Sequence, residues 1–126
     1  MREELVKLLK NSYAPISGKS VAAIVKMKDG NIFKGVNVEN PSFKSGLCAE
    51  QVAIGSAIAA GYTKGSFDSI YIMDDDNSFI EPCFLCRQNF VDLFDSTANI
   101  ILLTMDGKEK IYKMSDLCPH PFRMED

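Results

Sequence analysis

No run of residues in this chain approaches the roughly 20 apolar positions that a membrane-spanning helix needs. The N-terminal segment, MREELVKLLK, mixes charged with apolar side chains and so lacks the uninterrupted apolar core of a signal peptide. Internal repeats, low-complexity stretches and linkers are also missing from the sequence. We therefore expect one domain covering residues 1–126, a cytoplasmic location and no membrane partner.

The chain also lacks a clustered excess of basic residues. Its 14 lysine and arginine residues are outnumbered by 17 aspartate and glutamate residues, which gives a net charge of −3. Proteins that bind nucleic acid normally carry a basic surface that neutralises phosphates. We therefore expect a small-molecule substrate and no nucleic-acid partner. Hydrophobic residues make up 46% and charged residues 25%, as in an ordinary globular domain that can bury a core without disulfides.

Cysteine is sparse, and in a reducing compartment the four cysteines would be thiols rather than disulfides. Clustered thiols in such a compartment are usually metal ligands or catalytic groups. The four are Cys48, Cys83, Cys86 and Cys118. We expect structural roles for Cys118 and for the only histidine, His120, because both lie apart from the other cysteines near the C-terminus.

Hydrophobic periodicity and turn signals predict alternating helices and strands, which indicates a layered α/β fold with a mixed sheet. An Asp-Gly pair between two apolar runs predicts a tight hairpin, and the Asp106-Gly107 turn is too short for a crossover helix, so the last two strands should be antiparallel. The apolar, small-residue helix should be buried against the sheet. The predicted elements are a helix over 2–11, a hairpin over 20–38, a helix over 49–61, a strand over 69–75, a helix over 87–94 and strands over 98–105 and 108–114.

Three cysteines lie at two predicted helix starts. Cys83 and Cys86 are three residues apart, where backbone N–H groups and the helix dipole favour thiolates. Taken alone, this pair could be half a structural zinc site, a redox pair or two buried thiols. Cys48 adds a third thiol, and at a non-helical cap position its side chain can enter the same cavity as that of Glu50, two residues later.

Glu50 separates a catalytic site from a structural one. It lies in a helix otherwise made almost entirely of small and apolar residues, where an unpaired carboxylate is costly to bury. A structural zinc module has no use for this carboxylate, whereas a hydrolytic site needs a proton carrier beside an activated water. Three ligands plus a nearby glutamate is the arrangement of an open catalytic zinc site, with water in the fourth position. The pattern CAE followed by PCFLC also matches the signature of zinc deaminases.

The chain resembles the homotetrameric cytidine deaminase family over most of its length, through GVNVEN at 35–40, CAE at 48–50 and PCFLCRQ at 82–88. The resemblance implies a three-layer α/β/α fold with a mixed five-stranded sheet, and hydrolytic deamination of cytidine or deoxycytidine in pyrimidine salvage. It implies one zinc ion per chain and Glu50 as the proton shuttle. The implied ligands are Cys48, Cys83 and Cys86; the implied substrate-binding residues are Asn37, Glu39, Ala49 and, from a neighbouring subunit, Phe122.

Several positions depart from the family's pattern. Lys19 stands where a phenylalanine usually stacks on the base, and we expect this lysine to face solvent. Phe43 replaces a tyrosine, and Gln51 replaces an arginine that would offset the charge of three thiolates. The bulky pair Phe84-Leu85 replaces two small residues. The acidic run 74–76 is expected to be a solvated loop after a strand.

Other functions remain open at this point. Blasticidin S deaminase has similar motifs, although GVNVEN favours a substrate with an ordinary ribose. A structural zinc module would need Cys118 or His120 as its fourth ligand. A redox protein could use Cys83 and Cys86, but nothing would then give Glu50 a role.

Overall fold

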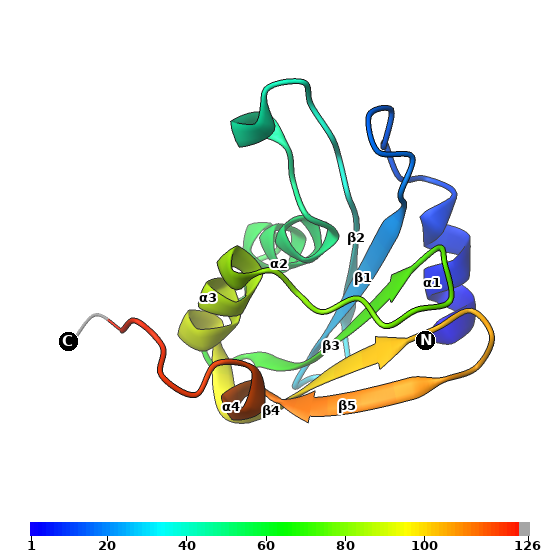
Figure 1. Ribbon diagram of the computed structural model, residues 1–126. Helices are drawn as coiled ribbons and strands as arrows, with labels where there is room; N and C mark the ends of the chain where they lie inside the picture. The colour runs from blue at the N-terminus through cyan, green and yellow to red at the C-terminus, as the bar shows by residue number, and fades with distance from the viewer. Residues whose placement is uncertain (124–126) are drawn as a thin grey trace.

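A five-stranded mixed sheet forms the centre of the computed structural model, which describes residues 1–123 apart from the side chain of Phe43 (Figure 1). The strand order is β2-β1-β3-β4-β5, and only β3 and β4 pair in parallel. The expected antiparallel pairing of the last two strands is confirmed. The strands are β1 (Val21–Met27), β2 (Ile32–Val36), β3 (Phe67–Asp74), β4 (Phe94–Leu103) and β5 (Glu109–Lys113).

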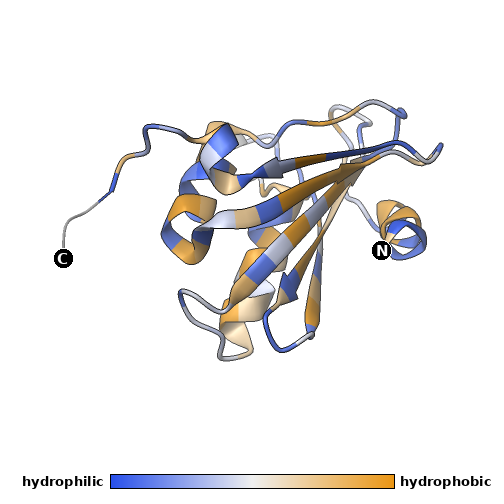
Figure 2. Cartoon of the chain, turned by 90° about the horizontal axis from the view of Figure 1, so that it is seen from below, coloured by the Kyte–Doolittle hydropathy of each residue, from blue (hydrophilic) through white to orange (hydrophobic). Residues whose placement is uncertain are grey.

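Helices cover both faces of this sheet, so the three-layer α/β/α architecture is confirmed. Helix α1 (Arg2–Leu9) packs on one face, whereas α2 (Ala49–Ala59), α3 (Phe84–Leu93) and the short α4 (Met114–Leu117) pack on the other. Figure 2 shows α1 alone on its side of the sheet. Alternate residues of β1 supply the two cores, with Ile24 facing α1 and Val25 facing α2. None of the helices within residues 1–123 is long and apolar enough to cross a membrane.

The helix predicted over 87–94 begins earlier and ends earlier than expected. Cys83 is its extended N-cap, and helix α3 therefore starts at Phe84. Phe94 does not belong to the helix, because its backbone is already extended and it pairs with Phe67 at the start of β4. Phe94 is still buried, and its ring centre lies 4.9 Å from that of Phe67. The prediction that Phe94 is a core residue is therefore correct, but its assignment to a helix is wrong. Helix α4 was not predicted.

Helix α2 lies unusually close to β2 because Gly35 has no side chain. A Cβ atom at position 35 would lie 2.3 Å from the carbonyl oxygen of Ala49 and 2.4 Å from the amide nitrogen of Ala53. This contact fixes the first turns of α2 against the sheet. Only one side of the helix is buried, however; Gly55, Ser56 and Ile58 on the other side are exposed in the single chain. As predicted, the chain leaves the helix through Gly61, whose φ is +102°.

Candidate active site

The three motif cysteines meet at the N-terminal ends of α2 and α3. Cys48 is the N-cap of α2 and Cys83 is the N-cap of α3, and both have extended backbones, while Cys86 lies in the first turn of α3. Because Cys48 is a cap rather than a helical residue, its side chain and that of Glu50 reach the same cavity, as the sequence required. Helix N-termini stabilise negative charge and therefore favour thiolates at these positions.

The sulfur atoms lie close enough together to bind one metal ion. All three lie within 4.8 Å of one another, and the Sγ atoms of Cys48 and Cys83 are 3.9 Å apart. Zinc–sulfur bonds of about 2.3 Å in a tetrahedron place two sulfurs about 3.8 Å apart, so the residues fit zinc. A hydrogen bond from Cys86 lowers the pKa of the Cys48 thiol to about 7, which favours the ligating thiolate.

No fourth side chain joins this group among the residues that the structure describes. Cys118 and His120, the ligands that a structural zinc module would need, are not part of the cluster. Cys118 is half-buried and His120 is exposed. Three protein ligands with an open fourth position is the arrangement of catalytic rather than structural zinc sites.

Glu50 is the buried carboxylate of the site. It is 5% exposed, in the first turn of α2, and it lines the same cavity as Cys48 and Cys83. Burial raises the pKa of this carboxyl above its ordinary value, and hydrogen bonds from its own backbone amide and from Cys86 act against this rise. A carboxyl whose pKa is raised in this way is a better proton acceptor than an exposed carboxylate, as a proton carrier in catalysis needs to be.

A cavity of about 520 Å³ brings the predicted residues together, a size typical of small-molecule sites. Beyond the residues named in the sequence, Ile16, Lys44, Ile80 and Glu81 also line it. These residues carry no motif signal, because their place in the wall depends on how distant loops meet. Leu85 lines the cavity as well and is 69% exposed. The predicted residues in its wall are Asn37, Glu39, Cys48, Ala49, Glu50 and Cys83.

Asn37 has most of its hydrogen-bonding capacity committed to the protein. Its Oδ1 accepts from the hydroxyl of Ser12 and from the backbone amide of Val21. Its Nδ2 donates to the carbonyl oxygen of Lys19 at 2.9 Å. An asparagine side chain offers two lone pairs and two N–H bonds. Asn37 therefore retains one N–H for a ligand.

Glu39 also has most of its hydrogen-bonding capacity committed to the protein. Its Oε1 accepts from the backbone amides of Ile16 and Ser17, and its Oε2 accepts from the Ser17 hydroxyl. The Ser17 contacts hold the pKa of this carboxyl below its ordinary value, so it is ionised at neutral pH. One acceptor position remains at Oε2. Together, Glu39 and Asn37 offer one acceptor and one donor, which matches a single hydroxyl group.

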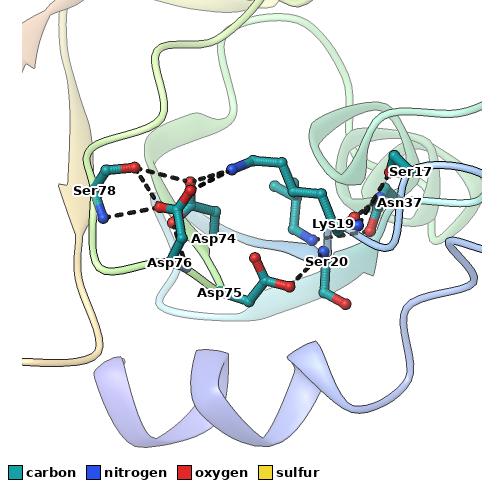
Figure 3. A network of polar contacts seen from close by, with 9 residues as sticks. Ser17, Lys19, Ser20, Asn37, Asp74, Asp75, Asp76 and Ser78 are labelled. Atoms are coloured by element: carbon teal, nitrogen blue, oxygen red, sulfur yellow. Dashed lines mark hydrogen bonds and ion pairs between the residues drawn. The ribbon is translucent and has the colours of Figure 1, made fainter.

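As expected for the acidic run, Asp75 and Asp76 are exposed in the loop after β3, and Lys19, whose side chain is 40% exposed, does not line the cavity. The expectation is wrong for Asp74, which is the last residue of β3, and it did not include the ion pairs that Lys19 forms (Figure 3). The ammonium of Lys19 lies 3.1 Å from the carboxylate of Asp74 and 2.8 Å from that of Asp76. Asp74 is buried, and Asp75 accepts a hydrogen bond from the backbone amide of Ser20. The acidic run therefore fastens the 17–20 segment to the end of β3.

Gln51 has a role that the sequence did not reveal. Its Oε1 accepts a hydrogen bond from the backbone amide of Cys48 at 2.9 Å and so closes a capping box at the start of α2. The oxygen of this amide thus holds the backbone of a metal ligand. Any hydrogen bond from Gln51 to a ligand sulfur would therefore have to come from its Nε2.

Phe122 lies outside the cavity of its own chain. Its ring is 67% exposed, and its carbonyl oxygen accepts a hydrogen bond from Gln88 on α3. Phe84 is also exposed, with the guanidinium of Arg87 lying 4.5 Å from its ring centre. Arg87 further donates to the carbonyl oxygens of Pro82 and Leu117, so it joins the metal-ligand loop to α4.

Comparison with known proteins is consistent with this geometry. The family described as the cytidine and deoxycytidylate deaminase zinc-binding region matches residues 1–103. A cytidine deaminase of Mycoplasma genitalium is 30% identical over 121 residues, covering 96% of this chain and 92% of its own length. A probable cytidine deaminase of Dictyostelium discoideum is 34% identical and covers 91% of this chain and 76% of its own. The crystal structure of a cytidine deaminase from Burkholderia pseudomallei superposes with a TM-score of 0.90 at 37% identity, covering 95% of this chain and 94% of its own. These matches, together with the three-thiol site described above, establish that this chain belongs to the cytidine deaminase family.

Proposed function

We propose that this protein hydrolyses the 4-amino group of cytidine or deoxycytidine, which yields uridine or deoxyuridine and ammonia, as in pyrimidine salvage. The observation that carries the proposal is the buried carboxylate of Glu50, which shares a cavity with Cys48 and Cys83 where the three motif thiols converge. The family and its relatives support the same reaction. A redox function for Cys83 and Cys86 would leave the buried Glu50 without a role.

Cys48, Cys83 and Cys86 would hold one zinc ion per chain, with the fourth position open to water. When bound, zinc lowers the pKa of a water molecule and makes it a nucleophile at neutral pH. Glu50 then moves the protons. It would accept one from the water that attacks C4 and pass it to N3 of the ring. It would then carry the second proton from the new C4 hydroxyl to the amino group, so that the C4–N bond breaks as the C4=O bond forms. Water is consumed and ammonia is released, so the reaction balances.

Asn37 and Glu39 would bind the sugar. One free N–H on Asn37 and one free acceptor position on Glu39 suit a hydroxyl that accepts from the first and donates to the second. We assign this hydroxyl to the 3′ position, since both cytidine and deoxycytidine carry it. Ala49, in the cavity wall, would contact the base. This pair favours a nucleoside over blasticidin S, whose sugar is not an ordinary ribose.

The direct test is to incubate the purified protein with cytidine, deoxycytidine and blasticidin S and to follow the absorbance change on deamination. We expect both nucleosides to react, with one zinc per chain by metal analysis. Reaction with blasticidin S alone would favour the alternative deaminase. A protein that holds zinc but deaminates none of the three would contradict the proposed function.

We also propose a homotetramer in which Phe122 reaches the site of a neighbouring subunit. The exposed side of α2 carries small residues together with Ile58, which is 47% exposed, and small residues allow close helix packing. Phe122 is exposed and lies outside its own cavity. Light scattering should give four times the subunit mass, and a fully active monomer would refute this assembly.

We also propose a domain organisation and a cellular location. We propose one domain for residues 1–126. Helix α1, near one end of the chain, packs on the sheet, and β5, near the other end, is a strand of that same sheet. We propose a cytoplasmic location, because a reducing compartment keeps ligand thiols from forming disulfides. Neither a nucleic-acid partner nor a membrane partner is proposed, given the net charge of −3.

A further inference from the structure

Lys19 connects two parts of the molecule that border the cavity. Its side chain forms ion pairs with Asp74 and Asp76, which end β3 and begin the following loop. Its backbone carbonyl accepts the hydrogen bond from Nδ2 of Asn37 at 2.9 Å. Figure 3 shows these groups in one continuous network. Lys19 itself does not line the cavity, so it can influence a ligand there only through a neighbour.

We propose that Lys19 is a positioning residue for substrate binding: its ion pairs with Asp74 and Asp76 hold the carbonyl that orients the amide of Asn37 toward the sugar hydroxyl. This inference rests on the proposed function, in which Asn37 binds that hydroxyl.

The geometry of Asn37 explains why one carbonyl matters. An asparagine amide can turn about its last side-chain bond, and its two ends then exchange donor and acceptor roles. In this protein, Oδ1 is held by the Ser12 hydroxyl and the backbone amide of Val21, whereas Nδ2 is held by the carbonyl of Lys19. The second N–H of Nδ2 points to a ligand only while that carbonyl keeps its place. A displaced carbonyl would leave the remaining N–H poorly aligned.

The ion pairs are placed to keep the carbonyl fixed. Residues 17–20 form a loop with Gly18 at φ +69°, so regular secondary structure does not hold it. Its restraints include hydrogen bonds from the Gly18 amide to the carbonyl oxygen of Ala14, from Ser17 to Glu39 and from the Ser20 amide to Asp75, together with the Lys19 ion pairs. The Asp74 side chain is only 2% exposed, which makes it a rigid partner on the sheet. Removing the ammonium also leaves this buried carboxylate without its cation, which favours movement of the loop.

The test compares Lys19→Met, which keeps the apolar stem and removes the charge, with Lys19→Arg, which keeps the charge. Lys19→Met should raise the KM for cytidine about 2- to 10-fold, the value of one neutral hydrogen bond, with little change in kcat. Lys19→Arg should restore most of the affinity. Lys28→Met is the matched control, because it removes the exposed ion pair between Lys28 and Asp95, 2.9 Å long, at the other end of β1. Its KM should equal that of the wild type.

Two comparisons distinguish positioning from a general structural effect. The KM for 3′-deoxycytidine, which lacks the proposed hydroxyl, should not change in Lys19→Met. In combination with Asn37→Ala, the Lys19 substitution should add little, because both act on the same hydrogen bond. Equal KM increases for the two substrates, or additive effects with Asn37→Ala, would overturn the proposal.

A variant with a milder change covers the case in which Lys19→Met does not fold. Asp76→Asn removes the more exposed carboxylate, 52% accessible, and leaves the pair with Asp74 intact. It should raise the KM for cytidine in the same direction by a smaller factor, and an unchanged KM would count against the proposal. If the wild type fails to deaminate cytidine, the proposed function is wrong. If the wild type is active and the Lys19 and Asp76 variants match it, only the present inference is wrong.

Discussion

Gly35 sets the distance between β2 and α2, so Gly35→Ala tests how the fold positions the site. The added Cβ would lie 2.3 Å from the oxygen of Ala49 and 2.4 Å from the nitrogen of Ala53, where ordinary contacts begin at 3.4 Å. Both neighbours are backbone atoms and cannot rotate away. The start of α2 would therefore move from the strand by about 1 Å, because packed interiors hold no spare volume.

This displacement should harm catalysis more than stability. Overpacking typically costs about 1–3 kcal/mol, and we expect the upper end here because backbone must move. The same movement shifts Cys48 and Glu50, at the start of α2, relative to Cys83 and Cys86 on α3. A misplacement of about 1 Å can lower a rate by about 100-fold. We therefore expect a loss of that order in kcat/KM together with weaker zinc retention.

The assay combines urea unfolding, zinc content and kcat/KM per folded chain. Leu5→Ala is the control, since Leu5 is fully buried against the opposite face of the sheet. It should cost about 2–5 kcal/mol yet leave kcat/KM near the wild-type value. A Gly35→Ala protein with wild-type stability, zinc content and kcat/KM would refute the reasoning.

Three further predictions follow from the site and its surroundings. Phe122→Ala should raise the KM without lowering kcat; an unchanged KM in an intact tetramer would exclude its proposed role. Gln51→Arg should hold or raise turnover and move the acidic limb of the pH profile downward, because a guanidinium offsets thiolate charge. It should also lower the free energy of unfolding by about 1 kcal/mol, since arginine cannot accept from the Cys48 amide; a limb that stays in place would contradict the charge argument. Lys19 lowers the pKa of Asp76 below its ordinary value of 3.8, so this stabilisation exists above pH 3.8 and is lost as the pH falls below it. The stability difference between wild type and Lys19→Met should therefore shrink on acidification, and a difference independent of pH would disprove the linkage.

Local signals made most of the fold predictable from the sequence. Asp29-Gly30 and Asp106-Gly107 mark the two tight turns, and apolar runs mark the buried strands β1, β3 and β4. Phe94 was misassigned because a short apolar run fits the end of a helix and the start of a buried strand equally well. Its parallel pairing with Phe67 decides the matter, and that contact is not local.

The metal site was also predictable from local sequence signals. Cys83 and Cys86 lie within one helical turn, and Cys48 and Glu50 lie within another, so short-range geometry fixes each pair. The ion pairs of Lys19 with Asp74 and Asp76 could not be predicted, because they depend on the antiparallel register that places Val21 opposite Asp74. The sequence shows a lone lysine and a distant acidic run, and only the sheet brings them together.

The most direct test of the proposed function is Glu50→Gln, which keeps the volume of the buried side chain and removes its capacity to carry a proton. Glu81→Gln is the matched control, since Glu81 lines the same cavity but is exposed. We expect Glu50→Gln to keep one zinc per chain and to lose about 100-fold or more in kcat for cytidine, whereas Glu81→Gln stays active. A folded, zinc-loaded Glu50→Gln protein with the kcat of the wild type would contradict the account.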